Sequence, residues 1–181
     1  MSIDTTKSFV PLKIVVITIS DTRTEENDKS GKFLTSALQS AGHQLFDKII
    51  IKDDLENIVT TLQKYTLHPS VEVIICTGGT GLTARDVTPE AFKKVVEKEI
   101  PGFGELFRYL SFQKIGTSTI QSRATAGTAN QTLLFALPGS TGACKDAWEG
   151  ILKWQLDIRH RPCNFAEILP RMGENARGKS I

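Results

Sequence analysis

A short apolar run that ends in a glycine-rich loop constrains this chain more than any other part of its sequence. Residues 71–76 read Val-Glu-Val-Ile-Ile-Cys, and residues 77–81 read Thr-Gly-Gly-Thr-Gly. The run predicts a buried strand, because short, mostly apolar runs rich in β-branched residues are typical of strands covered on both faces. Thr88, Pro89 and Glu90 then predict a helix start, with Thr88 as the cap. A strand, a bare loop and a helix N-terminus together favour phosphate binding.

Two other apolar runs end in similar loops. Residues 13–19 are almost continuously apolar and stop at Ser20 and Asp21, whereas residues 133–137 lead into a second glycine loop. In open parallel sheets, ligands bind beyond the carboxyl ends of the strands. If the three strands are parallel, their loops open on the same edge and form one site.

Helical stripes separate the strands, and this alternation predicts an α/β fold with helices on both faces of a mostly parallel sheet. We expect one domain over residues 13–170, a flexible segment over residues 1–12 and a polar C-terminal tail over residues 171–181. The expected elements are a helix up to Gly42, a strand over 44–51, a helix from 55, a helix from 88 that Pro101 and Gly102 end, a short helix over 103–110, a strand or extended loop within 115–129 and a long helix after Gly142.

The composition is that of an ordinary globular protein. Of 181 residues, 40% are hydrophobic and 23% are charged, and the net charge of +2 does not predict a nucleic-acid-binding face. The sequence has neither an N-terminal apolar segment nor a run of membrane-spanning length, so we expect a cytoplasmic protein. Three cysteines and three histidines have no disulfide or metal-ligand spacing.

The charged residues near the glycine loop restrict which ligands the loop could bind. The loop matches neither the Walker A nor the dinucleotide-binding pattern, but its three glycines exceed what a single turn needs. Asp86 would repel a bound phosphate unless a cation intervened, and magnesium bound by one or two carboxylates is the usual intermediary. Asp53 lies at another strand-to-helix junction and could supply the second carboxylate. The alternative is that these residues only cap a helix or stabilise a turn. Arg85, Arg123 and Lys145 could balance phosphate charge, and the best candidate is the pair Ser122-Arg123.

Four motifs together resemble the molybdopterin-binding domain family. They are Thr-Gly-Gly-Thr-Gly from Thr77, Asp86-x-Thr-Pro-Glu-Ala, Pro-Gly-Phe-Gly-Glu from Pro101, and Pro-Gly-Ser from Pro138. This family comprises molybdenum cofactor biosynthesis proteins and molybdopterin adenylyltransferases. Three further segments look closest to the branch called molybdenum cofactor biosynthesis protein B: Gly-Thr-Ser-Thr from Gly116, Gln121-Ser122-Arg123, and Arg-Pro-Cys-Asn-Phe from Arg161.

The resemblance implies a three-layer α/β/α sandwich that assembles into trimers or into hexamers, each a dimer of trimers. It implies that the chain binds molybdopterin and adenylylates it with Mg-ATP, releasing pyrophosphate. It places catalysis and Mg²⁺ binding on Asp53 and Asp86. The implied substrate-binding residues are Ser20, Asp21, Thr77, Gly78, Gly79, Thr80, Gly81, Thr88, Pro89, Glu90, Ser122, Arg123, Pro138, Gly139 and Ser140.

Some alternatives stay open at this stage. The second loop lacks the Asn or Gln and the second Pro that adenylyltransferases often have, whereas both carboxylates are kept. A non-catalytic pterin-binding module and a nucleotide hydrolase are the competing functions. We expect molybdopterin and ATP as ligands, neither nucleic acid nor membrane as a partner, and other proteins of molybdenum cofactor biosynthesis as further partners. Phe103, Phe107 and Phe112 would mark an oligomer interface if they were exposed.

Overall fold

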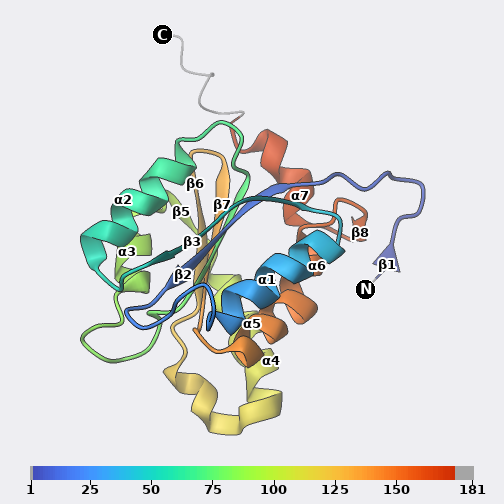
Figure 1. Ribbon diagram of the computed structural model, residues 1–181. Helices are drawn as coiled ribbons and strands as arrows, with labels where there is room; N and C mark the ends of the chain where they lie inside the picture. Colours follow the sequence, from blue (N-terminus) through green and yellow to red (C-terminus); the bar gives the residue numbers. More distant parts are fainter. Residues whose placement is uncertain (1, 174–181) are drawn as a thin grey trace.

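A six-stranded sheet forms the middle layer of the structure, which is a computed structural model that describes residues 2–173 (Figure 1). The four strands on one side of the sheet are parallel, and β6 pairs antiparallel with both β7 and β5. In spatial order the strands are β3 (Gln44–Ile51), β2 (Lys13–Ile19), β4 (Val73–Thr77), β7 (Thr132–Leu137), β6 (Thr125–Ala129) and β5 (Lys98–Glu99).

Helices cover both faces of this sheet, which confirms the expected three-layer α/β/α sandwich (Figure 1). One face is covered by α2 (Leu55–Thr66) and α3 (Thr88–Val95), and the other by α1 (Lys29–Ser40), α4 (Pro101–Ile115), α5 (Thr141–Ala147), α6 (Lys153–Gln155) and α7 (Phe165–Ile168). Alternate residues of a strand point to opposite faces. Val15 and Ile17 therefore pack with the α2–α3 layer, whereas Ile14 and Val16 pack with the α1–α5 layer.

The prediction of one helix from residue 88 to Pro101 is wrong for the second half of that segment. It ends at Val95, and Val96 is extended, with φ −70° and ψ 128°. The backbone N–H groups of Glu97 and Ile100 donate to β6, at 2.8 and 2.9 Å, so this segment adds the edge strand β5. Pro101 then begins α4 instead of ending a helix, because proline suits the first helical turn.

The segments that follow are more helical than expected. α4 has 15 residues, so it is not a short helix. The 3₁₀ helix η1 (Gly116–Gln121) precedes β6, and the expected extended segment is therefore a strand only in its last part. The expected long helix after Gly142 is present, but the π-helical turn η2 (Trp148–Leu152) divides it.

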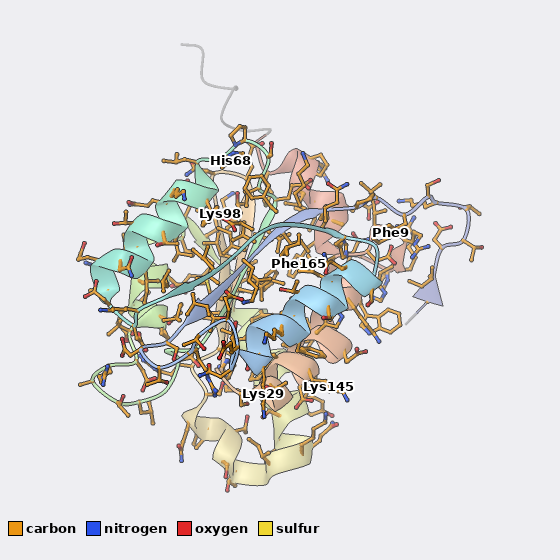
Figure 2. The ribbon with its side chains drawn as sticks, viewed as in Figure 1. Phe9, Lys29, His68, Lys98, Lys145 and Phe165 are labelled. Carbon is orange, nitrogen blue, oxygen red and sulfur yellow. The ribbon has the colours of Figure 1, made fainter. Side chains whose placement is uncertain are left out.

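The N-terminal segment, expected to be flexible, packs against the C-terminal part of the domain. β1 (Ser2–Ile3) pairs with β8 (His160–Arg161), and Arg161 donates to Asp4 at 2.9 Å. Phe9 of this segment, labelled in Figure 2, packs against the His43 ring at a centroid distance of 5.1 Å. Contacts with residues that are distant in the sequence thus hold the N-terminal segment in place. Of the expected C-terminal tail, residues 171–173 are described, and Arg171 ends the 3₁₀ helix η3 (Leu169–Arg171). Residues 174–181 lie outside the described residues.

The three phenylalanines of α4 divide between core and surface. Phe103 and Phe107 are buried, so they do not belong to an exposed interface, whereas Phe112 is 53% exposed. The oligomeric state stays a prediction. Among residues 2–173, no helix is both long enough and apolar enough to cross a lipid bilayer.

Candidate functional site

A cavity of about 650 Å³ lies beyond the carboxyl ends of β2, β4 and β7. These strands are parallel neighbours, with Thr18 paired to Thr77 and Thr77 paired to Leu137. Their three loops line the cavity, as the sequence predicted, and residues of α4 and η1 close another side. We call this space the carboxyl-edge cavity. Its volume is typical of sites for cofactors and small ligands.

Glycine is required at the start of the β4 loop for structural reasons. Gly78 and Gly79 have φ of 112° and 61°, which L residues rarely adopt. A Cβ atom on Gly78 would lie 2.1 Å from the carbonyl oxygen of Ile19, and one on Gly79 would lie 2.3 Å from Thr88 Oγ1. The turn therefore requires two of the three glycines, whereas a Cβ on Gly81 would meet only side-chain atoms of Asp86.

Thr88 fastens this loop but does not cap α3. Val87 occupies the N-cap position, and Thr88 is the first helical residue. The Thr88 hydroxyl donates to the carbonyl oxygen of Gly78 at 2.9 Å, and its backbone N–H donates to Gly79 at 3.0 Å. The expectation of a capping threonine is thus wrong, because the hydroxyl donates to the carbonyl of the buried Gly78.

The β7 loop is short and lies against the β4 loop. A Cβ atom on Gly139 would be 3.3 Å from the Cα of Gly78. The Ser30 hydroxyl donates to the Gly139 carbonyl at 2.9 Å, and Ser140 caps α5 by accepting from the Ala143 N–H at 3.2 Å. The two glycine loops therefore form one continuous floor of the cavity.

The loop after β2 provides the third side. The Ser20 Oγ accepts from the backbone N–H of Thr22 at 3.2 Å, which fixes the turn. Asp21 forms an ion pair with Arg85, whose side chain is 74% exposed. This pair links the β2 loop to the tip of the β4 loop and places one cation at the cavity.

The two carboxylates expected to act in catalysis both lie against the β4 loop. A Cβ atom on Gly79 would be 2.8 Å from Asp53 Oδ2, and one on Gly81 would be 2.8 Å from Asp86 Oδ2. Asp54, and not Asp53, caps α2, by accepting from the Asn57 N–H at 2.9 Å. Asp53 is therefore not needed for capping and faces the cavity.

The environments of the two carboxylates differ. Burial raises the pKa of Asp53; the Val87 N–H opposes this shift, and the carboxylates of Asp86 and Asp21 add to it. Hydrogen bonds from Thr83 hold the pKa of Asp86 below its ordinary value, with the Thr83 hydroxyl at 2.6 Å and its N–H at 2.9 Å. Asp86 thus stabilises a turn, as the alternative interpretation held, while its carboxylate also lines the cavity.

This donor set fits a magnesium ion shared with phosphate. Within residues 2–173, no group of three or more His, Cys, Asp or Glu side chains is arranged to hold a metal by itself. Mg²⁺ is usually held by one or two carboxylates, with phosphate oxygens and water completing its shell. Mutual repulsion of Asp53, Asp86 and Asp21 is the electrostatic situation that a bound cation would relieve.

Arg123 lies outside the cavity lining, and other groups of the protein hold its side chain. Its Nε donates to the Gly81 carbonyl at 2.8 Å, its Nη2 donates to the Asp86 carbonyl at 2.6 Å, and its Nη1 pairs with Glu90. Every nitrogen of the guanidinium thus has a protein partner. Lys145, labelled with Lys29 in Figure 2, also lies outside the lining, on the helix layer formed by α1 and α5.

Most of the residues expected from the sequence line the cavity. Besides Asp53 and Asp86 they are Ser20, Asp21, Thr77, Gly78, Gly79, Thr80, Gly81, Ser122, Pro138, Gly139 and Ser140. Thr88, Pro89, Glu90 and Arg123 do not line it. Contact of any of these residues with a substrate stays a prediction.

Two groups of lining residues were not predicted from the sequence. On the β2 side, buried Asp28 accepts from the Thr18 hydroxyl at 2.9 Å and caps α1, and its position before a helix was a usable signal. On the other side, α4 and η1 contribute polar residues for which only the Ser and Thr content of residues 116–122 gave a hint. These are Ser111, Ser118, Thr119 and Gln121, together with Phe107 and Ile115.

The fold and the cavity define an α/β protein whose candidate ligand site lies at the carboxyl edge of a parallel sheet. The family model described as a probable molybdopterin binding domain matches residues 15–157. The chain belongs to this molybdopterin-binding family of molybdenum cofactor biosynthesis proteins.

Individual relatives agree with this assignment over most of the chain. Molybdenum cofactor biosynthesis protein B of Escherichia coli (strain K12) is 51% identical over 157 residues, which cover 87% of this chain and 92% of that protein. The protein of the same name from Staphylococcus aureus (strain COL) is 47% identical over 149 residues, 81% of this chain and 88% of that protein. A crystal structure of molybdenum cofactor biosynthesis protein B superposes with a TM-score of 0.78 at 40% identity and covers 93% of this chain and 95% of that chain.

Proposed function

We propose that this chain binds molybdopterin in the carboxyl-edge cavity and transfers the adenylyl group of Mg-ATP to the terminal phosphate of the pterin. The observation that carries the proposal is the placement of Asp53 and Asp86 against the same glycine loop. Membership of the molybdopterin-binding family supports the choice of pterin. A phosphate loop flanked by two carboxylates supports magnesium-dependent phosphoryl chemistry.

The reaction needs no side-chain nucleophile. An oxygen of the pterin phosphate attacks the α-phosphorus of ATP, and the bond from that phosphorus to the bridging oxygen of the β-phosphate breaks. Pyrophosphate leaves with the electron pair, and adenylylated molybdopterin remains. Since both reactants are anionic, positioning and charge neutralisation must supply most of the rate enhancement.

The residues of the cavity divide these tasks. The bare β4 loop over residues 78–81 would hold the pterin phosphate, because no side chain prevents its close approach to the backbone. Asp53 and Asp86 would hold magnesium, which when bound offsets the charge of the nucleotide phosphates. Both Arg23 and Arg85 line the cavity. Arg85 lies beside these carboxylates, and it can exchange its partner Asp21 for a phosphate because its side chain is exposed.

Pyrophosphate release from the protein with molybdopterin, ATP and magnesium tests the proposal. We expect Asp53→Asn and Asp86→Asn to lower kcat by about 10²- to 10³-fold, as loss of an electrostatic group in an active site typically does. Binding of molybdopterin, followed by its absorbance or fluorescence, should change by less than about threefold, since the binding energy comes from other groups. Asp146→Asn is the control, because this carboxylate pairs with Lys114 and does not line the cavity.

Three outcomes would contradict the proposal. A parent protein that binds molybdopterin but releases no pyrophosphate would be a binding module. ATP consumption without pterin would indicate a nucleotide hydrolase. Full turnover in both aspartate variants would remove the carboxylates from the mechanism.

A further inference from the structure

The β4 loop has a tip that apolar packing does not hold in place. It leaves β4 after Thr77 and returns to α3 at Thr88, and Leu82 at its tip is 70% exposed. Within the tip, the Asp86 N–H donates to the Thr83 carbonyl at 3.0 Å, and the Asp86 carboxylate accepts from Thr83. The ion pair between Arg85 and Asp21 links the tip to the β2 loop, but the Arg85 side chain is 74% exposed, and exposed ion pairs contribute little stability. The position of the Asp86 carboxylate over the cavity therefore depends on what fixes the base of the loop.

Arg123 joins the two limbs of the loop at that base. Gly81 is on the limb that leaves β4, and Asp86 is on the limb that returns to α3. The guanidinium donates to both of their carbonyl oxygens, at 2.8 and 2.6 Å. Its third nitrogen pairs with Glu90 in the first turn of α3, and its backbone N–H donates to Thr80 at 3.3 Å. One side chain thus links the loop, its returning limb and the helix that follows.

The arginine is itself held from a second element. Arg108 of α4 donates from its Nη1 to the carbonyls of Ser122 and Ala124, at 3.4 and 3.2 Å, on either side of Arg123. A planar guanidinium can serve several acceptors in fixed directions, whereas a lysine ammonium is a single mobile charge. The contacts of residue 123 therefore require an arginine, and Arg108 fixes the backbone from which its side chain extends.

We infer that Arg123 is a positioning residue that holds the Asp86 carboxylate in its place over the cavity by clamping the two limbs of the β4 loop. The inference rests on the proposed adenylyl transfer and differs from the expectation that Arg123 contacts substrate. To reach a phosphate, the guanidinium would have to leave two loop carbonyls and the Glu90 carboxylate. Its function follows from those contacts and is exerted through Asp86.

The test compares Arg123→Met with Arg161→Met. Arg161 also bridges two segments, Asp4 and Glu167, its side chain is 32% exposed against 29% for Arg123, and it lies outside the cavity lining. We expect Arg123→Met to lower kcat by about 10²-fold, the scale of a 1 Å misplacement of a catalytic group, and to raise the magnesium concentration needed for half-maximal rate. The KM for molybdopterin should change by less than about threefold, because the substrate contacts remain. Arg161→Met should shift Tm by about as much as Arg123→Met does, but should leave kcat within about twofold of the parent value.

A double-mutant cycle separates positioning from other effects. If Arg123 acts through Asp86, Arg123→Met should lower kcat by less than about threefold in the Asp86→Asn background. Arg123→Lys should recover only part of the rate, because one ammonium cannot replace three directed bonds. Multiplicative losses in the cycle, or a raised KM for molybdopterin with unchanged kcat, would overturn the inference.

Amide hydrogen exchange tests whether Arg123 fixes the β4 loop, and this measurement does not require catalytic turnover. In Arg123→Met, the N–H groups of Thr83, Asp86 and Val87 should exchange at least about tenfold faster than in the parent and in Arg161→Met. Unchanged exchange at these amides would overturn the clamp. If the parent released no pyrophosphate, the proposed function would fail, and the exchange rates would still show whether Arg123 fixes the loop.

Discussion

The β4 loop and the β7 loop start from neighbouring parallel strands and touch one another, but they differ in length and in charge. The β7 loop, residues 138–140, enters α5 at once and carries no charged side chain; hydroxyls of Ser30 and Ser140 fix it. The β4 loop is longer and carries Arg85 and Asp86, and Arg123 joins its limbs. A short loop can be fixed by its own backbone path, whereas a long loop that presents charges needs a side chain from elsewhere.

Adding one methyl group to each loop should give the largest contrast. In Gly79→Ala, the left-handed backbone and the contact of 2.3 Å with Thr88 Oγ1 should together lower the free energy of unfolding by about 2 to 4 kcal/mol. Gly139 needs no positive φ and is exposed, so Gly139→Ala should cost less than about 1 kcal/mol. Urea unfolding of both variants measures the difference. Equal losses would show that the two loops are equally constrained.

Removing one hydroxyl that holds each loop should give a smaller contrast. Thr88→Val removes a buried donor to the Gly78 carbonyl and should lower the free energy of unfolding by about 1 to 2 kcal/mol. Ser140→Ala removes an exposed helix cap and should cost about 0.5 to 1 kcal/mol. Thermal unfolding of the two variants at one pH provides the comparison. A larger loss for Ser140→Ala would reverse the order proposed for the loops.

Lowering the pH should change the difference between the two loops least, because the group that we expect to titrate, His43, lies outside both loops. Burial lowers the pKa of His43 to about 4 from 6.5, although the charge of Asp157 opposes this. Nδ1 of His43 accepts from the Leu12 N–H at 3.2 Å, Nε2 is buried without a partner, and Phe9, which packs on this ring, lies under Arg159. Between pH 6.5 and 4 the unfolded chain binds more protons at this residue, so stability should fall as the pH falls through this window.

His43→Gln tests this assignment through the slope of stability against pH. In the parent, this histidine should contribute a slope of up to about 1.4 kcal/mol per pH unit inside the window, and the variant should lose that contribution. The difference between the Gly79→Ala and Gly139→Ala variants should stay the same across the window. An unchanged slope in His43→Gln would assign the acid sensitivity to other groups.

The features that could be predicted from the sequence are local. The apolar runs that became β2, β4 and β7, and the breaks at Ser20, Thr77 and Pro138, depend on neighbouring residues alone. A parallel arrangement then brings the three loops to one edge without further information. The position of the cavity and the three loops that line it followed from this reasoning.

The features that could not be predicted depend on partners distant in the sequence. Lys98 and Glu99 are poor strand formers, and they form β5 because β6 offers them backbone groups. The Thr88 hydroxyl and the Arg123 guanidinium are directed by loop carbonyls whose positions exist only in the folded chain. The same is true of the N-terminal segment, whose strand β1 needs His160 and Arg161 at the far end of the sequence.

The order of strands in the sheet also affects how the chain is made. β4 lies between β2 and β7, but β7 begins only at Thr132, so during synthesis from the N-terminus β4 has a neighbour on one side alone. Val73, Ile74 and Ile75 would then border an open apolar sheet edge, the kind of surface on which nascent chains aggregate. Slow translation between β4 and β7 should therefore increase the need for chaperones, whereas the parallel pair β2–β4 can form early.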